Sequence, residues 1–144
     1  MQGIIKIESA ASSIPALRSA SLPAFELVAQ LREEVEGKPI LSPGKFIELM
    51  NLDVNSFAQH ARVHRNTVSR APATLSVQTH LRDNVRVLKA AFDVSGQDLK
   101  RAIFWYQNEP LAPFDYKTAE TLVAGGRVDD VIRLLESYEA GFSG

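Results

Sequence analysis

Apolar side chains recur every three or four positions along most of the chain, which is the spacing of one face of a helix. Residues 1–20 lack this periodicity, and we interpret them as an N-terminal arm. Ser21 then caps a helix with a proline in its first turn, and we expect this helix to extend to Gly37. Ser42 and Pro43 repeat the same start signal, so they predict a second helix.

Further helical segments follow towards the C-terminus. Residues 71–76 have the composition of a loop, and the next helix is predicted to end at residues 95–96. Three more helices are expected: one beginning near Leu99, a short one capped by Thr118, and a last one closed by Gly141. No segment alternates as a half-buried strand does, so the pattern predicts an all-α fold of five to seven helices.

Residues 53–70 are predicted to form two short helices across a tight turn. The inward positions are small or apolar: Phe57, Ala58, Ala61, Val63 and Val68. Six outward side chains are able to bind phosphates and base edges: His64, Arg65, Asn66, Thr67, Ser69 and Arg70. Arginine suits guanine and asparagine suits adenine in the major groove, so this face is a candidate DNA-binding surface. The alternative is a helical hairpin whose polar side is only solvated.

This segment resembles the helix-turn-helix of the Xre/Cro repressor family. The family's turn carries Gly-Val-Ser and its second helix Thr-Val-Ser-Arg, and the latter run is present here at residues 67–70. Arg62 replaces the turn glycine, and His64 replaces the capping serine. Either a left-handed backbone at Arg62 is strained, or the turn differs from that of the family.

Charge is distributed unevenly, although the net charge is only −1. Residues 57–93 contain 6 basic and 2 acidic side chains, whereas residues 94–144 contain 5 basic and 8 acidic ones. The middle of the chain is therefore the part that a phosphate backbone would attract. The acidic last third would repel DNA, so it requires a different role.

The last third of the chain contains a motif of aromatic, apolar and glycine residues at defined spacings. It includes Trp105, followed by Asn108 and Leu111, then residues 118–123 and the glycines at 125–126. The set resembles the toxin-binding domain of Xre/MbcA/ParS-type antitoxins over residues 97–142, and with the helix-turn-helix from about residue 41 onward. Ala119 replaces the usual helix-opening proline, and Tyr116 stands where glycine is common.

The resemblance implies a DNA-binding antitoxin. Members pair with toxins of the RES-domain class, which act on NAD, and their C-terminal helices cover the toxin's active site. The complex represses its own operon through the helix-turn-helix. We therefore expect a RES-domain toxin and operator DNA as partners, and a homodimer or a larger assembly with the toxin, since two-fold pairs usually bind operator half-sites. The expected domains are residues 1–37 (arm and helix), 38–94 (helix-turn-helix) and 95–144 (toxin binding).

Within the C-terminal domain, most motif residues are expected to form the core: Trp105, Leu111, Leu122, Val123, Val131 and Leu135. Candidates for contact with the toxin are side chains expected to be less buried: Tyr106, Glu109, Arg127, Arg133, Glu136, Glu139 and Phe142. Aromatic and arginine side chains are frequent anchors of interfaces.

Other functions have little support in the sequence. The chain has no cysteine, no glycine-rich phosphate loop and no recognisable Ser/His/Asp arrangement, so we expect neither catalysis nor a cofactor. His60 and His64 are one helical turn apart, but no third metal ligand is evident. No apolar run is long enough to span a membrane and no signal peptide is visible, so a cytoplasmic location is expected. The main alternative is a plain helix-turn-helix transcriptional regulator whose C-terminal domain dimerises.

Overall fold

The computed structural model describes residues 21–143, and the fold over this range is mostly helical. The elements in chain order are α1 (Ser21–Leu31), β1 (Arg32–Val35), β2 (Lys38–Leu41), α2 (Pro43–Met50), α3 (Val54–Ala61), α4 (Arg65–Arg70), α5 (Leu75–Val94), α6 (Leu99–Asn108), the 3₁₀ helix η3 (Ala112–Phe114), α7 (Ala119–Ala124) and α8 (Val128–Ser143). Within the described range, no helix is both long enough and apolar enough to cross a membrane.

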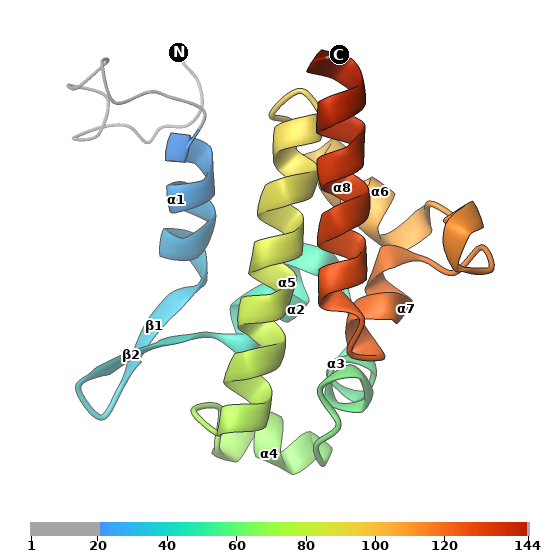
Figure 1. Ribbon diagram of the computed structural model, residues 1–144. Helices are drawn as coiled ribbons and strands as arrows, with labels where there is room; N and C mark the ends of the chain where they lie inside the picture. The colour runs from blue at the N-terminus through green and yellow to red at the C-terminus, as the bar shows by residue number, and fades with distance from the viewer. Residues whose placement is uncertain (1–20, 144) are drawn as a thin grey trace.

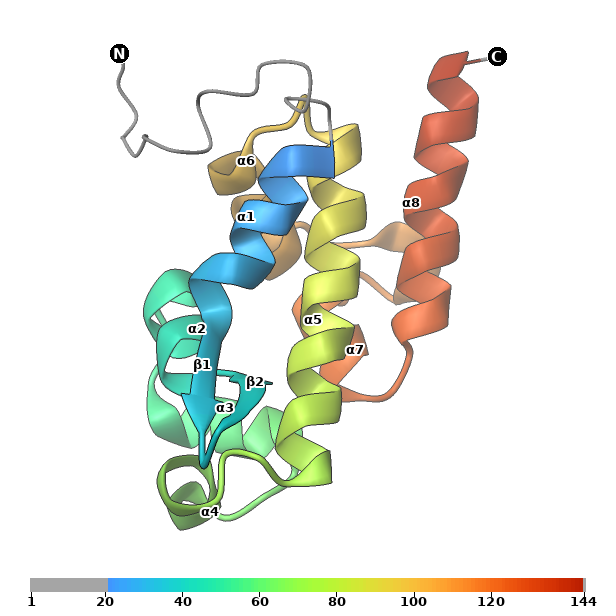
Figure 2. The ribbon, with the colours of Figure 1, turned by 90° about the vertical axis from the view of Figure 1, so that its left-hand side faces the viewer.

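The longest helix, α5, is the centre around which the other elements are arranged (Figure 1). It packs against α1 on one side and α8 on another, and α8 runs alongside it in the same direction (Figures 1 and 2). The short helix α4 lies at the end of the molecule where α5 begins (Figure 2). This position leaves one side of α4 facing away from the helices that form the core.

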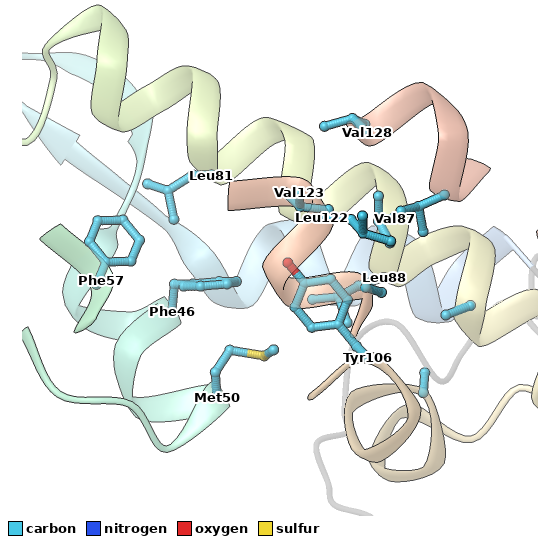
Figure 3. Packing of buried hydrophobic residues seen from close by; sticks show 14 of the residues in the cluster. Phe46, Met50, Phe57, Leu81, Val87, Leu88, Tyr106, Leu122, Val123 and Val128 are labelled. Atoms are coloured by element: carbon cyan, nitrogen blue, oxygen red, sulfur yellow. The ribbon is translucent and has the colours of Figure 1, made fainter. Parts of the chain in front are cut away.

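A continuous hydrophobic core joins the two halves of the chain (Figure 3). Phe46 and Phe57 come from α2 and α3, Leu88 comes from α5, and Leu122 and Leu135 come from α7 and α8. The buried face of α5 therefore contacts helices on both sides of residue 94, where the sequence predicts a domain boundary.

Local signals at several helix ends act as the sequence predicts. The Ser42 side chain accepts a hydrogen bond from the Lys45 N–H, and Pro43 opens α2. The Thr118 hydroxyl caps α7 by accepting from the Thr121 N–H. Each cap satisfies a backbone donor that has no partner within the helix itself.

The N-terminal helix is shorter than predicted. It ends at Leu31, and the chain continues as an antiparallel hairpin in which Arg32 pairs with Leu41 and Val35 with Lys38. The two-residue turn, Glu36 and Gly37, has positive φ at both positions, as the tight turn between paired strands requires. The expectation of a purely helical chain is therefore wrong at this segment.

The predicted end of the last helix also needs correction. The sequence predicts that Gly141 ends the helix in a left-handed conformation. Instead, α8 continues through Gly141 to Ser143, and the positive-φ glycines of the described chain are Gly37, Gly96 and Gly126.

Candidate nucleic-acid interface

The candidate interface starts from the cap of α3. The Asp53 carboxylate accepts hydrogen bonds from the Ser56 backbone N–H, at 2.7 Å, and from the Ser56 hydroxyl, at 3.2 Å. The bond from the Ser56 N–H is the main cause that lowers the pKa of Asp53 below its usual value. Asp53 therefore remains charged at neutral pH and fixes the start of α3.

The turn between α3 and α4 is formed by residues 62–64. Arg62 adopts the left-handed conformation, with φ of 61°. Its N–H donates to the Gln59 carbonyl at 3.2 Å, and the Val63 N–H donates to the Ala58 carbonyl at 3.0 Å. This pair of bonds closes α3 in the way a glycine-capped helix is closed, although an arginine occupies the glycine position.

His64 caps the following helix. Its Nδ1 accepts a hydrogen bond from the Asn66 N–H at 3.1 Å, and its backbone is extended. On the inner side of α4, Val68 is buried against the core. These two contacts determine which way the six-residue helix faces.

The structure brings the six predicted DNA-binding residues together on one surface. Five of them are exposed and one, Thr67, is half-buried: His64, Arg65, Asn66, Thr67, Ser69 and Arg70. They occupy the cap and the outer face of α4, at the end of the molecule (Figure 2). Their side chains are accessible to a large, flat or grooved ligand.

The positive charge of this surface is not neutralised within the part of the chain that the structure describes. Arg62, Arg65 and Arg70 form no ion pair with any carboxylate among residues 21–143. Two cations further along α5 differ, because Arg86 lies 3.2 Å from Asp129 and Lys89 lies 3.8 Å from Asp93. Three cations without a carboxylate partner therefore surround the α3–α4 turn, although other described cations, such as Arg82 and Arg101, also form no ion pair.

The predicted arginine contacts of the C-terminal region have partners within the chain. Asp130 accepts from Arg127 at 2.9 Å and from Arg133 at 2.6 Å. Hydrogen bonds from these two side chains, that of Arg127 first, lower the pKa of Asp130. The Arg127 guanidinium also lies 5.0 Å from the centre of the Phe114 ring, so it joins α8 to η3.

The exposure expected of Tyr106 is wrong. Its side chain is 1% exposed and lies among Met50, Leu88 and Leu122 (Figure 3). Trp105, expected in the core, is instead only half-buried at its edge. The helical spacing of Leu99 and Ala102 with Tyr106 contained the signal for this arrangement.

The acidic candidates at this end of the molecule are exposed. They are Glu109, Glu136 and Glu139. The Phe142 side chain lies outside the described residues. The sequence prediction missed two aromatic side chains, Phe104 and Tyr116, which are 68% and 69% exposed. Phe104 falls outside the buried stripe of α6, so its exposure could be found from helical spacing.

The histidines do not assemble a metal site in the described part of the chain. Residues 21–143 contain no group of three or more His, Asp or Glu side chains placed to hold a metal ion. The His60 ring lies edge-on to the His80 ring, with ring centres 6.3 Å apart, whereas His64 caps α4.

Comparisons of the chain with protein-family models, with curated proteins and with solved structures find no match. The function of this chain must therefore be inferred from its own residues.

Proposed function

We propose that this protein is a DNA-binding antitoxin, in which α4 contacts operator DNA and the C-terminal helices bind a RES-domain toxin. The observation that carries the DNA-binding part is the outer face of α4. Arg65 and Asn66 begin this helix at an exposed end of the molecule, and Arg65 has no carboxylate partner in the described chain.

The dimensions of α4 suit this role. B-DNA has a major groove about 12 Å wide, which admits one helix, and residues at the start of a recognition helix contact base edges. Arg65 and Asn66 occupy that position, and the unpaired charge of Arg62 and Arg70 suits adjacent phosphates. A homodimer would place two such helices about 34 Å apart, on successive turns of DNA.

The toxin-binding part is supported by the resemblance of residues 97–142 to antitoxin domains. Exposed aromatic side chains provide suitable anchors, since aromatic residues are enriched at interface centres. Phe104 on α6 and Tyr116 after η3 are such residues. Glu109, which follows Phe104 by five positions, is exposed, as are Glu136 and Glu139 on α8. Covering a toxin's active site with this region would exclude its substrate.

Co-expression with the product of the neighbouring gene tests the proposal. The protein should restore growth and co-purify with that product. The double variant Arg65→Ala/Asn66→Ala should keep both properties but lose repression of a reporter fused to the upstream DNA. The double variant Phe104→Ala/Tyr116→Ala should show the reverse, with weaker toxin capture and intact repression.

This pair of variants separates the two activities. Loss of toxin capture in the α4 variant would contradict the assigned division between the two surfaces. If no neighbouring product is neutralised while repression persists, the protein is a plain transcriptional regulator and the antitoxin proposal fails.

A further inference from the structure

A chain of buried polar side chains crosses the centre of the molecule. The Tyr106 hydroxyl of α6 donates to the Asn84 side-chain oxygen of α5. The Asn84 amide nitrogen lies 2.8 Å from the His80 carbonyl oxygen and 3.1 Å from His80 Nε2. All three side chains are buried, with 1%, 2% and 8% exposure for Tyr106, Asn84 and His80.

The hydrogen bonds fix the protonation of His80. A backbone carbonyl can only accept, so the Asn84 atom next to the His80 carbonyl must be the amide nitrogen. That nitrogen carries two hydrogens, and the second is available to His80 Nε2. His80 Nε2 must therefore be an acceptor, which requires a neutral ring with its proton on Nδ1.

The surroundings offer no compensation for a positive charge. From α3, the Phe57 ring lies 5.4 Å and the His60 ring 6.3 Å from the His80 ring, measured between centres. At the Tyr106 end of this series of hydrogen-bonded side chains, burial raises the pKa of the Tyr106 hydroxyl, and the negative charges of Glu120 on α7 and Asp83 on α5 raise it further. These two carboxylates do not contribute to the pKa of His80. Within residues 21–143, no carboxylate is hydrogen-bonded or ion-paired to His80.

We propose that His80 is a pH-sensitive switch, in which uptake of one proton at Nε2 breaks the bond to Asn84 and loosens the packing of α3 against α5. A second N–H at this position would face the Asn84 amide hydrogens, and the new charge would face Phe57 and His60. Because α4 follows α3 through a three-residue turn, the loosening extends to the helix pair that forms the candidate interface.

The direction of the pH effect follows from burial. Burial, and secondarily the charge of His60, lowers the pKa of His80 from 6.5 to about 4. In the unfolded protein, His80 therefore binds a proton below pH 6.5, whereas in the folded protein it binds one only below about pH 4. The stability that depends on neutral His80 is complete above pH 6.5 and is lost as the pH falls towards 4.

Denaturant unfolding at several pH values tests the switch. The wild-type protein should show an unfolding constant that rises about tenfold more between pH 7.5 and pH 5.5 than that of His80→Gln. Glutamine can accept from Asn84 but does not titrate. The control Thr79→Ala alters an exposed, non-titrating side chain next to His80 in the sequence and should leave the wild-type pH dependence unchanged. Equal pH dependence in wild type and His80→Gln would overturn the proposal.

A measurement on the wild-type protein covers the case in which His80→Gln does not fold. Titration of the His80 ring by NMR should show an apparent pKa below 5, and amide protection factors in α3, corrected for the intrinsic exchange rate at each pH, should fall on acidification before those in α8. A ring that titrates near 6.5, or an equal fall of the protection factors in both helices, would refute the switch. These readouts need no DNA, so they succeed or fail independently of the proposed function.

Discussion

Some residues of this protein adopt backbone conformations that their side chains disfavour. Arg62, at the turn before α4, and Asn51, at the end of α2, both have left-handed φ angles, of 61° and 56°. A Cβ atom makes this conformation costly by about 1–2 kcal/mol, although asparagine tolerates it better than most residues. The arginine is therefore the more strained of the two.

Replacing Arg62 by glycine should stabilise the protein. The expected gain is about 1 kcal/mol, because glycine adopts the left-handed conformation without steric cost. Thermal unfolding should show a melting temperature raised by a few degrees. The same substitution should weaken DNA binding modestly, because it removes a positive charge beside α4.

Asn51→Gly is the matched control for this prediction. It changes an equally left-handed residue to glycine but relieves less strain, so its melting temperature should move less. If the two variants behave alike, the arginine is not strained at this turn and the argument from its φ angle is wrong.

At the scale of elements, α5 holds its neighbours through buried polar side chains as well as apolar ones. Gln78 is the clearest case. Its side-chain oxygen accepts from the Leu41 N–H at 3.0 Å, and its amide donates to the carbonyls of Leu41 and Pro72, both at 2.8 Å. One side chain therefore ties the end of β2 and the loop before α5 to the central helix.

Replacing Gln78 by alanine should destabilise the protein by about 1–2 kcal/mol, because it leaves partly buried backbone groups of Leu41 without their partner. Denaturant unfolding measures this change. The neighbouring Thr79→Ala alters an exposed side chain of the same helix and should have little effect. A loss in Gln78→Ala no larger than that in Thr79→Ala would show that Gln78 does not hold the hairpin.

These contacts explain which elements the sequence predicts. The caps of α2, α3 and α7 and the outer face of α4 depend on residues within a few positions of one another, so local patterns predict them. The hairpin depends on Gln78, which is 37 positions from Leu41, while residues 32–36 favour a helix locally. The wrong prediction that Tyr106 is exposed has another cause. The Tyr106 hydroxyl donates to the buried Asn84 side chain, 22 positions away, and this partner allows a polar group to be buried.

The molecule as a whole contains one continuous core rather than two separate ones. The buried face of α5 contacts α3 on the N-terminal side and α6 and α8 on the C-terminal side. Arg86 and Asp129 add an exposed ion pair between α5 and α8. Of the candidate DNA-binding helices, α3 packs against both α4 and α5, and α5 in turn packs against α6 and α8. The stability of the DNA-binding helices therefore depends on the C-terminal helices.

We expect the described part of the chain to unfold in a single transition. The fluorescence of Trp105, the only tryptophan, reports on α6, whereas circular dichroism reports on all helices. The two signals should give coincident midpoints in urea. Separate midpoints would show that the two halves are independently stable, contrary to the shared core.

The central claim is that the outer face of α4 binds DNA. The most direct test is the affinity of the purified protein for the DNA upstream of its own gene, measured for wild type, for Arg65→Ala/Asn66→Ala, and for the matched control Arg101→Ala/Asn108→Ala on α6. The account predicts salt-sensitive binding that the α4 variant weakens at least about tenfold and the control leaves intact. Equal affinity of the α4 variant and the wild type would contradict it.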